Sequence, residues 1–328
     1  MIGETQDNTL IILMPVYNDW AALALLLPAL DRALSAKSLE ADVLVVDDGS
    51  TEPQPEDIRP AVFAAIKAID ILSLRRNLGH QRAIAIGLSY LEANGSSRPI
   101  VIMDSDGEDD PRDIARLVEE SKVHRGETIV FAARTRRSEK LIFRFLYQMY
   151  RLLHFLLTGI HVCVGNFSLV PSGLLKRLVA VSELWNHYAA AVYKARLPVA
   201  LVPVHRGRRL QGSSQMNIVN LVVHGLSAMA VFGDRIGVRL LIVVGVGMVA
   251  AGGALIAVLA IRFFTSLAIP GWATYAAGLL LVMLIQMLMI VLVFAFVILA
   301  ARDSASVIPS RDFVHVTGAI RRLYDRGC

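Results

Sequence analysis

Short apolar runs of strand character alternate with segments of helical apolar spacing along residues 9–132. The predicted strands cover residues 9–16, 42–46, 69–74, 100–103 and 128–132, and the predicted helices cover residues 19–36, 61–68, 81–93 and 113–124. Strands that alternate with helices in this way indicate a parallel sheet with helices on both of its faces. We therefore expect an α/β fold in this part of the chain.

The pattern changes beyond Arg134. Residues 138–157 place apolar and aromatic side chains among basic ones at helical spacing, which is typical of an amphipathic helix in a membrane interface. A helix that covers the sheet fits this segment nearly as well. Residues 218–232 form a second candidate for an interfacial helix.

Two long apolar spans follow, at about residues 240–261 and 273–301. Each meets the requirement of roughly 20 residues for a helix that crosses the hydrocarbon core of a bilayer. From residue 236 to residue 301 the only charged residues are Arg239 and Arg262. This length and lack of charge favour two transmembrane helices over a hairpin of buried helices in a soluble protein.

The basic charge of the chain points to phosphate and anionic lipid rather than to nucleic acid. The net charge is +5 and the isoelectric point about 9.4, with arginines grouped at 134–137, 206–209 and 321–326. Basic groups beside membrane spans suit anionic headgroups and phosphate substrates, and no segment resembles a nucleic-acid-binding module. The two cysteines, Cys163 and Cys328, are too few and too far apart for a zinc site or a disulfide framework.

Charges around the spans predict which side of the membrane the α/β part occupies. The N-terminus lacks the basic region and the cleavage site of a signal peptide. Arg235 and Arg239 precede the first span, Arg262 lies in the connecting loop, and five arginines follow the second span. Because cytoplasmic flanks are enriched in arginine and lysine, we expect both ends in the cytoplasm. The expected location is the inner (cytoplasmic) membrane, in a multi-pass protein whose α/β part faces the cytoplasm.

Acidic clusters close two of the predicted strands. The segment Asp47-Asp48-Gly49-Ser50 follows the second strand, and Asp104, Asp106 and Glu108 follow the fourth. Parallel sheets bind ligands at the carboxyl ends of their strands, and carboxylates there can converge on Mg2+ or Mn2+. Such a cation offsets the charge that builds on a departing nucleoside diphosphate. A solvated acidic turn with a helix N-cap is the plainer alternative, but two clusters one β-α unit apart favour a sugar-nucleotide site.

Five segments of the chain resemble the family 2 glycosyltransferases with the GT-A fold, which has a Rossmann-like, mostly parallel sheet. In chain order they are Met14-Pro15-Val16-Tyr17-Asn18-Asp19, Val45-Val46-Asp47-Asp48-Gly49-Ser50, Arg76-Asn77-Leu78-Gly79-His80-Gln81, Met103-Asp104-Ser105-Asp106 and Arg209-Leu210-Gln211-Gly212-Ser213-Ser214-Gln215-Met216. The resemblance is to the polyprenyl-phosphate glycosyltransferases, a group that includes the dolichyl-phosphate mannose synthases. It implies an inverting hexosyltransferase that moves a sugar from a UDP- or GDP-linked donor to polyprenyl phosphate with the aid of Mg2+ or Mn2+.

The resemblance also implies roles for individual residues. The site of the nucleobase and ribose would be lined by Pro15, Tyr17, Asp19 and Asp48. The cation would be held by Asp104, Asp106 and Glu108, which would also face the donor sugar. Phosphate charge would be met by Arg134 and Arg144, and a loop that closes on the substrates would contain Arg209, Ser214 and Gln215. Arg136 and Arg137 fit a basic face near acidic lipid at least as well as they fit the site. The histidines show no spacing typical of a metal site.

Two residues depart from the pattern of the relatives. Gln215 stands where the loop motif has a lysine, so this position brings no charge to a phosphate unless Arg206 or Arg208 compensates. Asn166 stands where relatives have an acidic residue before Phe-x-Leu, and an amide cannot act as a base. A polyprenyl phosphate needs little deprotonation, because its second ionisation lies near about pH 6. We therefore expect the lipid phosphate to displace the nucleoside diphosphate directly at the anomeric carbon, aided by alignment and charge neutralisation.

Two alternatives remain open on the sequence. A glycosyltransferase that acts on another membrane lipid, such as a diacylglycerol or a ceramide, needs a base for the hydroxyl, and Asn166 counts against it. A catalytically silent scaffold that binds nucleotide sugar is suggested by Asn166 and Gln215 and opposed by the intact carboxylates. A polysaccharide synthase and a dinucleotide oxidoreductase are disfavoured, since the chain lacks a Gln-x-x-Arg-Trp motif and a GxGxxG after the first strand.

The expected organisation has four parts. Residues 1–137 form the nucleotide-sugar-binding GT-A core, residues 138–235 an acceptor-side region with interfacial helices and the substrate loop, residues 236–301 the two transmembrane helices, and residues 302–328 a basic cytoplasmic tail. The expected partners are a nucleotide-sugar donor, a polyprenyl phosphate acceptor and membrane lipids, without nucleic acid. A homo-oligomer is kept among the expected assemblies.

Overall fold

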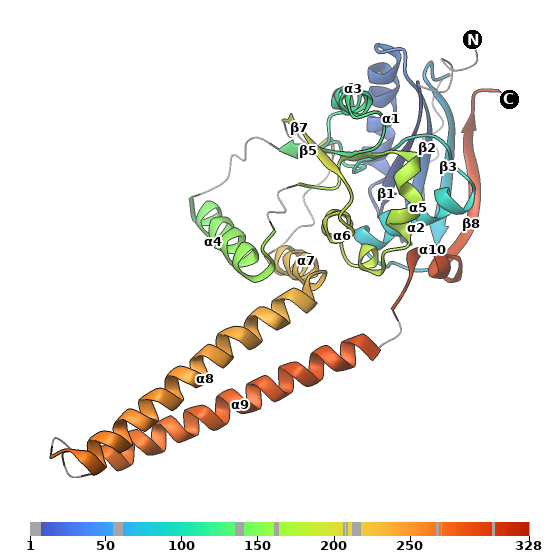
Figure 1. The fold of residues 1–328 in the computed structure, drawn as a ribbon. Helices are drawn as coiled ribbons and strands as arrows, with labels where there is room; N and C mark the ends of the chain where they lie inside the picture. Colours follow the sequence, from blue (N-terminus) through green and yellow to red (C-terminus); the bar gives the residue numbers. More distant parts are fainter. Residues whose placement is uncertain are drawn as a thin grey trace. The chain divides into compact units, whose positions relative to one another are not determined.

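A computed structural model describes most of the chain. The described residues are 8–54, 62–134, 141–160, 164–205, 207, 209–211, 218–266, 269, 271–303 and 306–327. The chain divides into a sheet unit (Met1–Tyr147, His161–Val231 and Ser306–Cys328) and a hairpin unit (Gln148–Ile160 and Phe232–Ala305). Figure 1 shows the strands of the sheet unit and the two long helices of the hairpin unit.

The sheet unit is built on an eight-stranded sheet with the strand order β7-β5-β6-β4-β1-β2-β3-β8. The strands are β1 (Thr9–Val16), β2 (Glu40–Asp47), β3 (Ile66–Leu74), β4 (Ile100–Ile102), β5 (Ile129–Arg134), β6 (Ser168–Val170), β7 (Val199–Val204) and β8 (Thr317–Asp325). Strands β6 and β8 are antiparallel to their neighbours, and the other pairs of adjacent strands are parallel. The predicted mostly parallel α/β sheet is therefore confirmed.

Helices cover both faces of this sheet. Helices α1 (Trp20–Ser35) and α3 (Ile114–Val123) pack on one face, and α2 (His80–Ala93), α5 (Ser172–Val179) and α6 (Tyr188–Lys194) pack on the other. The sheet unit also contains α7 (Ile218–Ala230), α10 (Pro309–Asp312) and short 3-10 turns at Pro111–Asp113, Ser182–Trp185 and Phe313–His315. Alternate residues of β1 face opposite cores. Leu10 and Ile12 pack with α1 and α3, whereas Ile11 and Leu13 pack with α2, α5 and α6. Burial on both faces explains why the central strands are apolar throughout rather than alternating.

The hairpin unit contains two helices that are long and apolar enough to cross a membrane, α8 (Gly233–Phe264) and α9 (Trp272–Asp303). Helix α4 (Leu141–Thr158) contributes its second half to this unit. The guanidinium of Arg239 donates hydrogen bonds to the carbonyl oxygens of Phe155 at 3.4 Å and Leu156 at 2.6 Å, in the last turn of α4, where carbonyls lack partners within the helix. The Phe155 carbonyl also accepts from the amide of Gly159. The predicted pair of spanning helices is thus present as two helices of the required length and composition.

Two segments differ from the prediction. The helix predicted at 61–68 is wrong, because β3 begins at Ile66. The carboxylate of Asp31 accepts hydrogen bonds from the amides of Ala64, Ala65 and Ile66, at 3.1, 2.7 and 3.0 Å, and this leads the chain into the strand. Pairing with β2 overrides the helical preference of the alanines. The region of residues 302–328, expected to be a basic tail, contains β8, which pairs with β3 at the edge of the sheet (Figure 1).

Candidate functional site

The acidic clusters lie at one edge of the sheet. Strands β1, β2 and β4 are adjacent and parallel, so the loops that follow Val16, Asp47 and Ile102 leave the sheet on the same side. The sequence predicted this placement. Parallel sheets commonly bind ligands at this edge.

Asn18 joins the first two of these loops. It has a positive φ of 54°, a conformation that asparagine adopts more readily than most residues. Its side-chain oxygen accepts hydrogen bonds from the backbone amides of Thr51 at 2.9 Å and Glu52 at 3.0 Å, and its backbone amide donates to the Ser50 hydroxyl at 3.0 Å. The loop after β1, which contains Tyr17, and the loop after β2, which contains Asp48, are thereby held together.

Asp48 is buried and anchors the loop before α2. Its two carboxylate oxygens accept hydrogen bonds from the amides of Leu78 at 2.7 Å and Gly79 at 2.8 Å. Burial raises the pKa of Asp48, and the two amides oppose that rise. Gly49, with φ of +68°, lies so close to this loop that an added Cβ would come within 2.6 Å of the Asn77 nitrogen.

The second acidic cluster forms a tight turn after β4. The amide of Asp104 donates to Asp109 Oδ2 at 3.0 Å, and Asp106 Oδ1 accepts from the amide of Glu108 at 2.9 Å. The hydroxyl of Ser105 donates to the carbonyl of Pro15 at 3.1 Å, which fixes the turn to the end of β1. Burial, together with the nearby charges of Asp104 and Glu108, raises the pKa of Asp106.

Arg209 connects the ends of β1 and β4. One guanidinium nitrogen lies 2.5 Å from Asp19 Oδ2 and another 3.2 Å from Asp106 Oδ2. The backbone around it follows the acidic turn, since the amides of Gly207 and Leu210 donate to the carbonyls of Glu108 and Asp106. The structure thus brings three residues predicted for the site, Asp19, Asp106 and Arg209, into direct contact.

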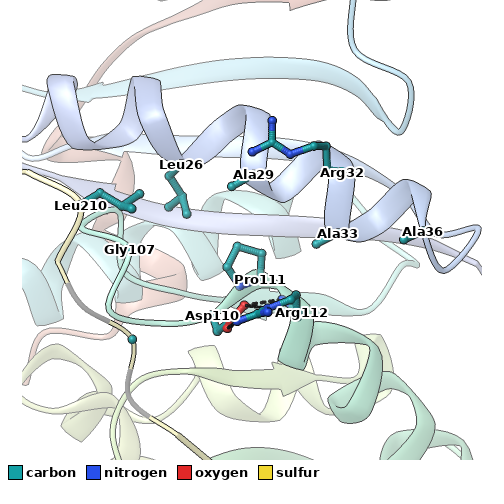
Figure 2. A pocket seen from close by; sticks show the side chains of 11 residues that line it. Leu26, Ala29, Arg32, Ala33, Ala36, Gly107, Asp110, Pro111, Arg112 and Leu210 are labelled. Atoms are coloured by element: carbon teal, nitrogen blue, oxygen red, sulfur yellow. Dashed lines mark hydrogen bonds and ion pairs between the residues drawn. The ribbon is translucent and has the colours of Figure 1, made fainter.

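A groove of about 510 Å3 lies beside this turn, between α1, the segment at 107–112, and residues Gly207 and Leu210 (Figure 2). Its lining is mostly apolar, and Leu210 projects into it from above Gly107. Asp110 and Arg112 form an ion pair on its floor, at 2.5 Å. The groove adjoins the acidic turn without containing Asp104 or Asp106.

No spacing in the sequence predicted His80 for the site, and the structure places it at the acidic cluster. Its Nε2 lies 3.1 Å from Asp104 Oδ1 and 2.9 Å from Asn166 Nδ2. The His80 side chain is 42% exposed. Partial desolvation acts to lower the pKa of His80, but the carboxylates of Asp104, Asp106 and Asp109 outweigh it and the pKa is raised. The available signal was its position at the start of α2, directly after the loop anchored by Asp48.

A hydrogen-bond chain fixes how Asn166 faces His80. The backbone amide of Tyr188 donates to Gln81 Oε1 at 2.7 Å, so Gln81 Nε2 is the group that donates to Asn166 Oδ1, at 3.0 Å. The amide nitrogen of Asn166 is left toward His80. With its proton on Nδ1, the imidazole accepts this hydrogen bond at Nε2, whereas the imidazolium directs an N–H toward Asp104.

The carboxylates suit a divalent cation that the substrate helps to bind. Within the part of the chain that the structure describes, no three histidine, cysteine, aspartate or glutamate side chains are grouped so as to hold a metal ion. Mg2+ usually needs only one or two carboxylates, because substrate phosphates complete its octahedral shell. Asp104 and Asp106 supply hard oxygens of this kind, so the residues fit the ion without a third protein ligand.

The remaining predicted residues are placed less directly. Pro15 lies at the end of β1, and the Tyr17 side chain is 47% exposed. Arg134 is the last residue of β5, paired with Val204, and Arg144 lies in α4. Ser214, Gln215, Arg206, Arg208, Arg136 and Arg137 lie outside the described residues.

Comparison with known proteins identifies the family. Residues 11–179, more than half of the chain, match the family described as Glycosyl transferase family 2. YkcC, an uncharacterized glycosyltransferase of Bacillus subtilis (strain 168), is 25% identical over 269 residues, which cover 80% of each chain. Undecaprenyl-phosphate 4-deoxy-4-formamido-L-arabinose transferase of Salmonella choleraesuis (strain SC-B67) is 26% identical over 271 residues, covering 80% of this chain and 78% of that protein.

Solved structures agree on the fold. Glucosyl-3-phosphoglycerate synthase from Mycobacterium tuberculosis, crystallised with Mn2+, UDP-glucose and phosphoglyceric acid, has a TM-score of 0.50 and 17% sequence identity. The match covers 72% of this chain and 84% of that one. The fold is the mostly parallel GT-A fold that the motifs predicted. The chain belongs to glycosyl transferase family 2.

Proposed function

We propose that the protein is a membrane-bound, inverting glycosyltransferase that moves a sugar from a nucleotide-sugar donor to polyprenyl phosphate. The observation that carries this proposal is the meeting of Asp19, Asp106 and Arg209 at the carboxyl edge of the sheet, with Asp104 in the same acidic turn. Similarity to undecaprenyl-phosphate transferases over 80% of the chain supports the acceptor. The two long apolar helices support it as well, because a protein that they anchor in a bilayer would meet such a lipid at the membrane surface.

The donor site is proposed at the strand ends. The two loops that Asn18 and Asp48 hold in place would bind the nucleobase and ribose, with Pro15 and Tyr17 beside them. A divalent cation, Mg2+ or Mn2+, held by Asp104, Asp106 and the donor phosphates would neutralise charge on the leaving group. The M. tuberculosis relative of the same fold binds UDP-glucose and Mn2+, which supports this class of donor and cation.

The acceptor phosphate supplies its own nucleophile. Its oxygen attacks the anomeric carbon, the bond from that carbon to the nucleoside diphosphate breaks on the opposite face, and the configuration inverts. Asn166 can hydrogen-bond to this phosphate but cannot remove a proton from it, and a dianionic phosphate needs no base. Arg209, Arg134 and Arg144 would meet the charges of the two phosphate groups, while Glu108 would face the donor sugar.

The connections of the chain support a single-sided arrangement. Along the chain, the residue before the hairpin, Val231, and the residue after it, Ser306, both belong to the sheet unit, so both ends of the hairpin connect to the same unit. If the helices span the bilayer, the sheet unit lies on one side of it. The arginines that flank the spans favour the cytoplasmic side of the inner membrane.

A lipid hydroxyl is the second candidate acceptor, and one observation favours it. The imidazole of His80 lies 2.9 Å from the Asn166 side chain, and a neutral imidazole can serve as the base that a hydroxyl requires. A diacylglycerol or a ceramide would then take the place of the polyprenyl phosphate.

One assay distinguishes the two candidate acceptors. Detergent-purified protein with Mn2+ would be supplied with a panel of UDP- and GDP-sugars and with undecaprenyl phosphate, diacylglycerol or ceramide, and the lipid-linked product measured. We expect product from one donor with undecaprenyl phosphate, and none with the hydroxyl lipids. Product only from a hydroxyl lipid would establish the second candidate, and nucleotide binding without any product would indicate a scaffold.

A further inference from the structure

We propose that Arg209 occupies the cation's place in the empty enzyme, as an internal counter-ion that the cation and donor must displace. The inference rests on the proposed cation at Asp106. It assigns Arg209 a task before substrates bind, in addition to any contact with the donor phosphates afterwards.

The geometry makes the two positive charges exclusive. Arg209 lies 3.2 Å from Asp106 Oδ2, while the amide of Glu108 donates to Asp106 Oδ1. Both oxygens of this half-buried carboxylate are therefore engaged. A cation at Asp106 Oδ2 would stand beside the guanidinium, where two like charges repel strongly at low local dielectric. The second ion pair, at 2.5 Å to Asp19, keeps the guanidinium in this position.

The segment that carries Arg209 is held lightly apart from these ion pairs. The amides of Gly207 and Leu210 make backbone hydrogen bonds to the acidic turn, and Leu210 rests on Gly107 with 44% of its surface exposed. Beneath it lies the groove rather than packed core (Figure 2). The ion pairs of Arg209 therefore add to two backbone hydrogen bonds and one partly exposed leucine contact in holding this segment to the acidic turn.

The direction in which cation affinity changes distinguishes this exchange from a simple supporting role of Arg209. Removing the charge of Arg209 frees Asp106 and should tighten binding of a divalent cation when nucleotide is absent. If Arg209 merely helped to build the cation site, the same substitution would weaken that binding. With nucleotide present the expected sign reverses, because the freed guanidinium then meets the diphosphate.

The test is Mn2+ binding to the full-length protein without nucleotide, measured by electron paramagnetic resonance of the free ion. We compare the wild type with Arg209→Gln and with Arg322→Gln, an arginine that bridges Asp70 and Asp325 on the edge strand β8. This control removes the same charge and the same kind of ion pair away from the acidic turn. Asp106→Asn marks the site, and circular dichroism checks that each variant is folded.

We expect Arg209→Gln to bind Mn2+ on the order of 10-fold more tightly than the wild type, Arg322→Gln to match the wild type, and Asp106→Asn to lose the site. Equal or weaker binding by Arg209→Gln, with binding still lost in Asp106→Asn, would overturn the exchange and leave the cation site standing. Mn2+ binding unaffected by Asp106→Asn would overturn the proposed cation site and the exchange with it. Arg209→Lys, which keeps the charge, should stay near the wild type and thereby shows that the charge is what matters. If the glutamine variant does not fold, the neutral variant Arg209→Met takes its place, with the same tightening expected.

Discussion

At the scale of single residues, Gly49 is where two loops of the site come closest. Its φ of +68° and its contacts with Arg76 and Asn77 leave no room for a side chain, since an added Cβ would lie 2.6 Å from the Asn77 nitrogen. Gly95 has the same φ of +68° but nothing within 4 Å of an added Cβ, so it isolates the effect of crowding from that of backbone conformation.

We therefore predict that Gly49→Ala destabilises the protein by about 1–3 kcal/mol more than Gly95→Ala does. It should also weaken binding of UDP or GDP, because the loop before α2 must shift. Thermal unfolding and nucleotide titration of the two variants measure both effects. Equal stability and equal nucleotide affinity would show that the close approach of these loops is unimportant.

Asn166 offers a second prediction, because it is the amide beside His80. The pKa of His80 is already raised by three nearby aspartates, which outweigh the effect of partial desolvation. Asn166→Asp replaces the facing amide by a carboxylate, so the pKa of His80 should rise further and the imidazole should stay protonated to higher pH. NMR titration of the histidines in metal-free protein measures this. Asn94→Asp, at the opposite end of α2, is the control and should leave His80 unchanged; a His80 pKa that falls or stays constant in Asn166→Asp would refute the contact.

The sequence located the carboxylates of the site but not their neighbours. Asp48, Asp104 and Asp106 follow apolar strands, and a parallel sheet gathers strand ends at one edge. The contact of His80 with Asn166 joins residues 86 positions apart and depends on α2 and β6 lying together. No local pattern encodes that arrangement, and histidine spacing alone gave a reason to ignore His80.

At the scale of elements, β8 completes the sheet where the sequence indicated a tail. Tyr324 packs edge-on against Phe63, with ring centroids 5.1 Å apart, and its hydroxyl accepts from the Phe63 amide at 3.1 Å. Arg322 pairs with Asp70 of β3 at 2.7 Å. These contacts cover the edge of β3, which would otherwise expose unpaired backbone groups.

We predict that a chain ending at Val316, without β8, melts at a lower temperature than a chain ending at Asp325. A loss of about 2–4 °C is expected for each kcal/mol of lost pairing. Aggregation should increase as well, since an open strand edge pairs with other chains. Circular dichroism melting of the two purified chains decides the matter, and the same melting temperature for both would mean that β8 contributes nothing to the sheet unit.

Gly237 fixes how closely α8 and α9 approach. A Cβ at this position would lie 2.6 Å from Ile298 Cδ1, whereas Gly245, in the same helix, has nothing within 4 Å. Small residues of this kind let membrane helices pack tightly. Gly237→Leu should therefore destabilise the hairpin by about 1–3 kcal/mol, and Gly245→Leu should not. Thermal inactivation of the two variants in detergent measures the difference; if both variants behave alike, the packing at Gly237 is unimportant.

Elements with a clear apolar period were predictable, and elements defined by a distant partner were not. Helix α1 buries Leu23, Leu26, Leu27, Leu30 and Leu34, a spacing visible in the sequence. Strand β8 exposes most of its residues, so it shows no apolar alternation, and it exists because β3 supplies the hydrogen bonds. The alanines at the start of β3 led to the wrong prediction of a helix for the same reason, because the local sequence does not show that this segment pairs with β2.

At the scale of the whole molecule, a GT-A sheet unit and an apolar helical hairpin belong to one chain. The apolar spans were predictable because their length and lack of charge are properties of the local sequence. The family followed from ordered motifs, whereas the donor sugar depends on the shape of a pocket that strand-end motifs do not specify. The combination is consistent with the proposed reaction between a water-soluble sugar nucleotide and a lipid whose phosphate lies at the membrane surface.

In the proposed function, the acidic turn of a membrane-bound enzyme promotes transfer of a sugar to a lipid phosphate. The most direct measurement is release of nucleoside diphosphate from the active sugar nucleotide, by purified protein with Mn2+, with and without undecaprenyl phosphate, in the wild type and in Asp106→Asn. We predict release that requires the lipid phosphate and falls by about 100-fold or more in Asp106→Asn, as expected when charge stabilisation in a transition state is removed. Release that is independent of the lipid would refute transfer to a lipid phosphate, and release undiminished in Asp106→Asn would refute the role of the acidic turn.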